Sequence, residues 1–191
     1  EAFTILKDLL LIPLISVIVT AIIAQFLVEP IIGTLNLLMN SGLQSMNGSS
    51  QIILGAVLGL MQSADMGGPI NKTAYLFATA ALANGQYVLM SAVLAGALIP
   101  PYVTGISSLL FRKKFTEKER GQGITNLIMG LAGISEGGIP FLLKDPLRVG
   151  AACMIGSAIA GGGSVLLGCS VMAPFGGFFI LPLNANPFGF V

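Results

Sequence analysis

Long uncharged, apolar stretches separated by short polar breaks are the dominant pattern of this chain. Charged residues are absent from residues 9–28, 30–64, 73–111, 121–135 and 149–191. A helix needs roughly 20 mainly apolar residues to cross a bilayer, and several of these stretches are long enough. The pattern predicts an all-α integral membrane protein with several spanning helices.

The first part of the chain contains two different patterns. Residues 9–32 are mainly aliphatic and predict a first span, with a kink or boundary at Pro30, because proline disfavours helical geometry at the residue before it. In residues 35–47 apolar side chains recur every three or four positions with amides between them. This spacing fits an amphipathic helix on the membrane surface, and equally an ordinary packed helix.

Two further spans are predicted over residues 86–111, which include Pro100-Pro101, and 149–172. Residues 51–64 and 121–134 are also apolar but short, and each runs into a segment rich in glycine and proline. The 25 glycines of the chain suit close helix approach in lipid.

Composition and charge support a membrane environment. The chain is 54% hydrophobic and 9% charged, against about 25% charged residues in a typical soluble domain. Five of the nine residues from Arg112 to Arg120 are basic. Excess positive charge in a short loop marks the cytoplasmic side, so we expect loop 112–120 in the cytoplasm.

Several classes of function are excluded by what the chain lacks. A net charge of +1 provides no basic surface for nucleic acid. The chain has no histidine, and Cys153 and Cys169 are too far apart for a metal-site motif, so we expect no metal and two buried thiols. A phosphate-binding GxxxxGK[ST] loop is missing, so we expect no bound nucleotide or other cofactor.

Two segments share one arrangement of residue types. Asp65-Met-Gly-Gly-Pro and Glu136-Gly-Gly-Ile-Pro each place an acid, two glycines and a proline within five positions, and a lysine follows the acid at Lys72 and Lys144. Glycine and proline break a helix and free backbone groups. Non-helical backbone at membrane depth survives only inside protein or beside a water-filled cavity. Paired interrupted segments of this kind predict the binding site of a transporter.

The acids are the leading candidates for contact with a ligand. A carboxylate inside a membrane protein is costly, accepts hydrogen bonds from hydroxyl groups and can act as a base. Asp65 is a candidate ligand contact, a helix cap or a partner of Lys72, and Glu136 is a candidate catalytic residue or a structural one. Asn71 would bind ligand or cap the following helix.

The remaining candidates are backbone groups and a boundary cluster. The glycines of the two motifs would offer backbone groups to a ligand, namely Gly67, Gly68, Gly137 and Gly138. Lys144, Asp145 and Arg148 form a cluster that we interpret as membrane-boundary anchors rather than ligands.

The ordered pair of motifs resembles a known family. Two signatures are similar to the fructose-type enzyme IIC membrane domain of the bacterial phosphotransferase system. The first is Gly55-Ala-Val-Leu-Gly-Leu-Met followed by Asp65-Met-Gly-Gly-Pro-Ile-Asn-Lys and the aromatic residues Tyr75 and Phe77, and the second is Gly133-Ile-Ser-Glu-Gly-Gly-Ile-Pro-Phe with Lys144-Asp-Pro-Leu-Arg. The resemblance covers essentially the whole chain but only the C-terminal part of a typical member.

The resemblance implies a sugar permease in the bacterial inner membrane. Such a permease moves a fructose-like sugar by an elevator-like shift of a transport domain, and a IIB partner carrying a phosphocysteine, itself charged through IIA, then phosphorylates the sugar. The permease is not catalytic alone, since the phosphoryl group comes from the partner phosphoprotein. It implies a scaffold helix (1–34), a surface linker helix (35–50) and a transport domain with two re-entrant hairpins (51–191), assembled as a homodimer through N-terminal helices outside this chain.

One residue departs from the family pattern. The family usually has Pro-His-Gly-Gly near the end of the domain, whereas this chain has Pro174-Phe175-Gly176-Gly177. The resemblance implies that Glu136 contacts the hydroxyl group that receives the phosphate and that Phe175 lies near the sugar. Phenylalanine offers no donor, acceptor or proton transfer.

Two other classes of function stay open on the sequence. An ion-coupled secondary transporter of a small polar solute would use the same interrupted helices. A purely structural membrane module is the third reading.

Overall fold

The structure is a computed structural model, and it describes residues 7–23, 25–26, 34, 37–38, 41–42, 45–46 and 48–190. The chain divides into two units, Glu1–Ser45 and Met46–Val191. In the first unit a π-helical turn, η1 (Lys7–Leu11), leads into α2 (Ile12–Ile23), a wholly apolar segment apart from its serine and threonine. The predicted boundary at Pro30 and most of the predicted amphipathic helix over residues 35–47 lie outside the described residues.

The second unit is mainly helical. Its helices are α4 (Gly48–Ala64), α5 (Pro69–Ala83), α6 (Val88–Leu110), α7 (Glu117–Leu131), α8 (Ile139–Lys144), α9 (Pro146–Leu166) and α10 (Pro187–Phe190). Three 3-10 turns, η3 (Arg112–Lys114), η4 (Glu136–Gly138) and η5 (Gly177–Leu183), connect them. Within the described residues the only β pairing is an isolated bridge between Val171 and Asn184, which confirms the predicted all-α class.

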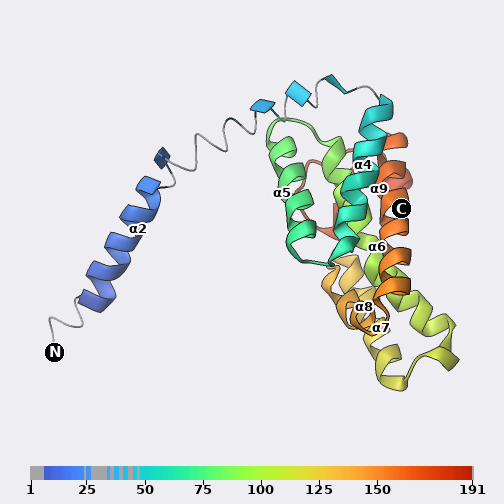
Figure 1. Cartoon of the computed structure of the whole chain (residues 1–191). Helices are drawn as coiled ribbons and strands as arrows, with labels where there is room; N and C mark the ends of the chain where they lie inside the picture. Colours follow the sequence, from blue (N-terminus) through green and yellow to red (C-terminus); the bar gives the residue numbers. More distant parts are fainter. Residues whose placement is uncertain are drawn as a thin grey trace. The chain divides into compact units, whose positions relative to one another are not determined.

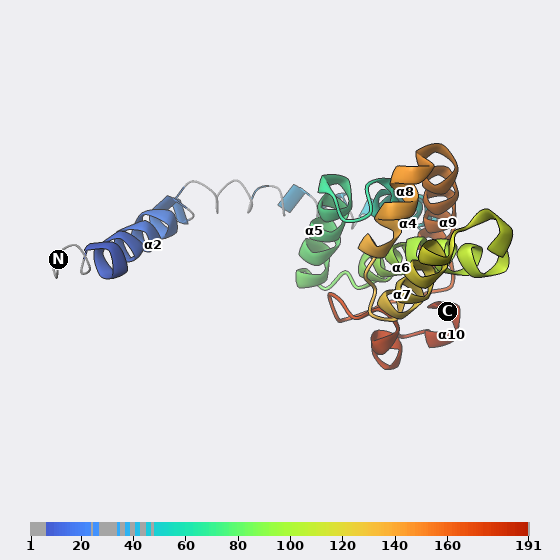
Figure 2. The same ribbon diagram turned by 90° about the horizontal axis from the view of Figure 1, so that it is seen from below.

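Helices α4, α6 and α9 pack together and form the centre of this unit (Figure 1). Seen from below, α6 lies between α4 and α7 (Figure 2). Small residues set the spacing: a Cβ atom on Gly96 of α6 would lie 2.7 Å from the Cα atom of Gly59 in α4. The Ser157 hydroxyl of α9 donates to the Gly96 carbonyl at 2.8 Å. Such small-residue contacts are typical of helices packed in a membrane.

In the part of the chain that the structure describes, α6 and α9 are the two helices long and apolar enough to cross a membrane. They correspond to the predicted spans 86–111 and 149–172. In the most apolar 18-residue segment of each helix, 78% is buried in α6 but 39% in α9. The outer face of α9 carries exposed Ile155 and Ile159, an apolar surface suited to lipid.

The two cysteines have the predicted environment. Cys153 and Cys169 are free thiols with no exposed surface. They are small apolar core residues, as is usual for buried free cysteine.

Candidate functional site

The first motif, Asp65-Met-Gly-Gly-Pro, forms a break between two helices. α4 ends at Ala64 and α5 begins at Pro69. Between them, Met66 has a φ of 45° and Gly67 a φ of 109°, so the chain reverses through left-handed backbone. Glycine adopts this conformation without steric cost, and proline fits the first position of a helix because its missing N–H group would have no partner there.

Asp65 caps the helix that follows. Its carboxylate oxygens accept hydrogen bonds from the backbone N–H groups of Ile70 (2.7 Å) and Asn71 (3.0 Å). Gly68, at the N-cap position, has no side chain to do so. A carboxylate is favoured beside a helix N-terminus because the helix dipole is positive there. Of the alternatives predicted for Asp65, the structure shows the helix cap.

Asn71 joins the two helices of this hairpin. Its side-chain amide donates to the backbone carbonyl of Gln62 at 2.7 Å, and the side-chain amide of Gln62 donates to the backbone carbonyl of Asn71 at 3.2 Å. Both side chains are buried. The reciprocal pair satisfies polar groups that would otherwise destabilise the interior, and it fixes the start of α5 against the end of α4.

The second motif is also a helix interruption. α7 ends at Leu131, and η4 then places Glu136 at the start of a short turn that leads into α8. Gly137 packs so closely on Asn126 that a Cβ atom would lie 2.5 Å from the amide oxygen. Asn126 is buried and donates to the Thr104 hydroxyl of α6 at 2.9 Å. Glu136 therefore extends from a turn that is anchored on the protein core.

The two interruptions contact one another. A Cβ atom on Gly67 would lie 2.7 Å from the Glu136 carboxylate, and one on Gly138 would lie 2.8 Å from the sulfur of Met66. Met66 is fully buried between them. Two motifs far apart in the sequence thus meet face to face, as expected of paired interrupted helices.

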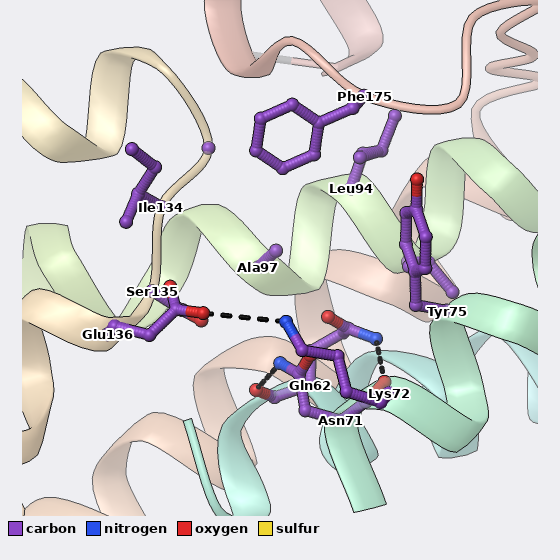
Figure 3. A pocket seen from close by; sticks show the side chains of 12 residues that line it. Gln62, Asn71, Lys72, Tyr75, Leu94, Ala97, Ile134, Ser135, Glu136 and Phe175 are labelled. Carbon is purple, nitrogen blue, oxygen red and sulfur yellow. Dashed lines mark hydrogen bonds and ion pairs between the residues drawn. The ribbon is translucent and has the colours of Figure 1, made fainter. Parts of the chain in front are cut away.

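A cavity of about 380 Å³ opens beside this contact, within the range of roughly 300–1,000 Å³ common for small-molecule sites. It is lined by Gln62, Asn71, Lys72, Tyr75, Val93, Leu94, Ala97, Gly133, Ile134, Ser135, Glu136 and Phe175. Figure 3 shows Lys72 and Glu136 pointing toward each other, with Phe175 on the opposite side of the cavity.

Three of the predicted site residues line this cavity: Asn71, Glu136 and Phe175. The other predicted contacts, Asp65 and the glycines 67, 68, 137 and 138, are outside the lining and form the support behind it. Their contact with a ligand stays a prediction.

Four polar lining residues were not predicted as ligand contacts, namely Gln62, Lys72, Tyr75 and Ser135. Lys72 and Ser135 lie within or next to the motifs, so their position in the sequence was an available signal. Gln62 and Tyr75 lie one helical turn before and after the first motif, and only the hairpin geometry brings them to the cavity.

The two charged residues of the lining form an ion pair. The Lys72 ammonium lies 3.5 Å from a Glu136 carboxylate oxygen, and the side chains are 58% and 44% exposed. The predicted Asp65–Lys72 pair is not formed, because the Asp65 carboxylate binds backbone N–H groups and Lys72 reaches across to the other motif. An exposed pair at this distance is weak and easily exchanged for another partner.

The loop around Phe175 returns to the second motif. Gly177 packs on Gly133 so tightly that a Cβ atom on Gly133 would lie 3.1 Å from the Gly177 Cα atom. Phe175 itself is half-exposed at the cavity. The close backbone contact explains why residue 177 is glycine, and it brings this distant segment to one side of the site.

The predicted boundary cluster lies away from the cavity. Lys144 binds Glu119, and Asp145 caps α9 through the Arg148 N–H at 3.2 Å. The Lys144 ammonium and the hydrogen bonds from Thr116 lower the pKa of Glu119 to about 2. No group of three or more potential metal ligands occurs in the described part of the chain.

Comparison with known proteins gives the family. The chain is 41% identical over 177 residues to the PTS system fructose-specific EIIB'BC component of Escherichia coli K12, covering 92% of this chain and 31% of that protein. It is 38% identical over 183 residues to the fructose permease IIC component of Bacillus amyloliquefaciens, covering 95% of this chain and 60% of that protein. The chain is a homologue of the fructose-type IIC permeases. The resemblance predicted from the two motifs is confirmed.

The chain matches only part of the length of its relatives. A second EIIB'BC component, from Rhodobacter capsulatus, is 40% identical over 178 residues. The chain spans about a third of the length of these EIIB'BC relatives and 60% of the B. amyloliquefaciens permease. No protein-family model matches the chain. No solved structure matches it either.

Proposed function

We propose that this fructose-type IIC homologue is the sugar-carrying part of a phosphotransferase-system permease. It binds a fructose-like sugar in the cavity between the two motifs and carries it across the membrane, where a IIB phosphocysteine phosphorylates it. The observation that carries the proposal is the contact between two interrupted helices beside a cavity lined by the Glu136 carboxylate. The names of the relatives support a sugar substrate and IIA and IIB partners.

The cavity offers groups that suit a sugar. Glu136 would accept a hydrogen bond from a hydroxyl group and take its proton when that oxygen attacks phosphorus. Tyr75 and Ser135 add hydroxyl groups, and Phe175 and Leu94 add apolar surface. A few polar groups set in an apolar wall are typical of small-molecule sites.

The wider organisation follows the same proposal. The protein lies in the bacterial inner membrane with loop 112–120 in the cytoplasm, supported by the five basic residues of that loop. The unit from residue 51 is the transport domain, with re-entrant hairpins at the two motifs, and it moves against a scaffold in a homodimer by an elevator-like shift. The phosphoryl group comes from the partner, so this part alone catalyses no turnover.

The ion-coupled alternative has no comparable support, since the relatives compared above are components of the phosphotransferase system. Both functions are tested in membrane vesicles without ion gradients. Vesicles containing the full-length permease and supplied with phosphorylated IIB should still accumulate sugar phosphate. Uptake that stops when the gradients collapse, or free sugar as the product, would overturn the proposal.

A further inference from the structure

The role proposed for Glu136 leaves one charged residue of the cavity without a function. Among the lining residues Lys72 is the single cation and Glu136 the single anion. Lys72 comes from the first motif and Glu136 from the second, and their charged groups lie 3.5 Å apart.

The main chain of Lys72 is held firmly. Its N–H group donates to the Gly68 carbonyl at 3.0 Å. The two preceding N–H groups bind Asp65, and the Asn71 side chain is tied to Gln62. The Lys72 ammonium itself is exposed, so a fixed backbone carries a movable charge at the cavity.

The helix itself gains nothing from a lysine at this position. Lys72 lies in the first turn of α5, where the helix dipole is positive and a cation is disfavoured. Its exposed ion pair contributes little stability. A ligand that is negative at this point would account for the placement better than the stability of the hairpin does.

We propose that Lys72 contacts the transferring phosphoryl group and stabilises its charge. The inference rests on the proposed function. Before transfer Lys72 pairs with Glu136 and offsets the repulsion between that carboxylate and an approaching phosphoryl group. Lysine and arginine side chains that contact the transferring group are a general means of stabilising phosphoryl transfer.

One bond to phosphorus forms in this step and one breaks. The sugar oxygen forms a bond to phosphorus while the phosphorus–sulfur bond of the IIB phosphocysteine breaks and the cysteine leaves as a thiolate. The hydroxyl proton passes to Glu136, which becomes neutral. Lys72 keeps its charge throughout and, having lost its carboxylate partner, pairs with the phosphoryl oxygens of the product.

The test separates sugar binding from phosphoryl transfer in the full-length permease. Lys72→Met should leave sugar affinity, measured without a phosphoryl donor, within about threefold of the wild type. Single-turnover transfer from phosphorylated IIB should fall by about 100-fold, the scale found when a preorganised charge-stabilising group is removed. Lys72→Arg should recover at least a tenth of the wild-type rate, because it retains the cation.

Lys144→Met is the matched control, since it breaks the other lysine–glutamate pair, away from the cavity. It should transfer at the wild-type rate. Unchanged transfer in Lys72→Met, an equal loss of binding and transfer, or no recovery in Lys72→Arg would each overturn the role of Lys72. If the wild type itself fails to transfer, the proposed function fails instead.

Discussion

The two motifs have similar residues but use them in different ways. The acid of the first, Asp65, binds backbone N–H groups of α5, and its lysine, Lys72, reaches the acid of the second. In the second motif the acid, Glu136, faces the cavity, and Lys144 binds Glu119 outside it. The shared pattern therefore locates two breaks in the helices, but the surrounding backbone decides what each acid does.

The difference lies in the groups that each carboxylate binds. Asp65 lies four residues before Pro69, so its carboxylate can fold back over the free N–H groups of the first turn. Glu136 lies four residues before Pro140, but it belongs to a 3-10 turn, and its carboxylate pairs with the Lys72 ammonium. Asp65 is therefore bonded to the backbone of α5, whereas Glu136 lines the cavity where the proposed substrate would bind.

The strongest test of this contrast is Glu136→Gln, which keeps the size of the side chain and removes the base. We expect sugar phosphorylation to fall by about 100-fold or more, because general bases contribute roughly 10²–10⁴-fold. Expression and thermal stability should stay at wild-type levels. Phosphorylation by IIB, measured with radioactive phosphoryl donor, checks this. A normal rate would remove Glu136 from the mechanism.

Gly68→Val tests whether the first break supports the site. The new Cβ atom would lie 2.5 Å from the Asp65 carboxylate, so the cap must shift and the start of α5 with it. We expect sugar affinity to fall by about tenfold, equivalent to about 1.4 kcal/mol. Equilibrium binding of labelled sugar measures it, with Gly163→Ala as control because no atom lies within 4 Å of a Cβ there. Wild-type affinity would show that this hairpin is not part of the site.

Asp65→Ala should show the structural role of the first acid. Loss of a helix cap costs about 1 kcal/mol, so thermal unfolding in detergent should begin at a lower temperature. Transfer per folded molecule should change only a few-fold, unlike in Glu136→Gln. Asp65→Asn, which retains one acceptor oxygen, should recover part of the stability. A loss of transfer as large as that of Glu136→Gln, without destabilisation, would contradict the division between the acids.

Phe175→His sharpens the comparison by adding a titratable group to the cavity. The ring is half-exposed, so an imidazole fits without disturbing the core. Because histidine titrates near pH 6.5, we expect a new pH dependence of phosphorylation between about pH 6 and 7. Rates measured across that range, with wild type in parallel, check it. Identical pH profiles would mean that residue 175 takes no part in the chemistry.

The smallest effect is expected at the Lys144–Glu119 pair. The pKa of Glu119 is lowered from 4.5 to about 2, so its contribution to stability is complete above pH 4.5 and is lost as the pH falls through about 2. Glu119→Gln should therefore be slightly less stable than wild type at pH 6 and equal to it near pH 2. Thermal unfolding of both proteins in detergent across this range measures the difference. A constant difference would argue against the pair.

The sequence predicted the helices better than the site. Runs of apolar residues located α6 and α9, and glycine with proline located both breaks, because these signals are local. Of the alternatives for Asp65, the pair with Lys72 is wrong, because the folded hairpin brings Lys72 to Glu136 instead. Tyr75 and Gln62 were missed for the same reason: their common cavity exists only once α4 and α5 fold together.

The close packing of α4, α6 and α9 has a consequence for transport. A side chain on Gly59 would strike the Ser157 carbonyl, and Gly96 meets Gly59 backbone to backbone. At these contacts no side chain separates the backbones, so we expect the three helices to resist sliding past one another. In the transport proposed above, we expect the three helices to cross the membrane together as one rigid body, and the path for water to open around them rather than between them.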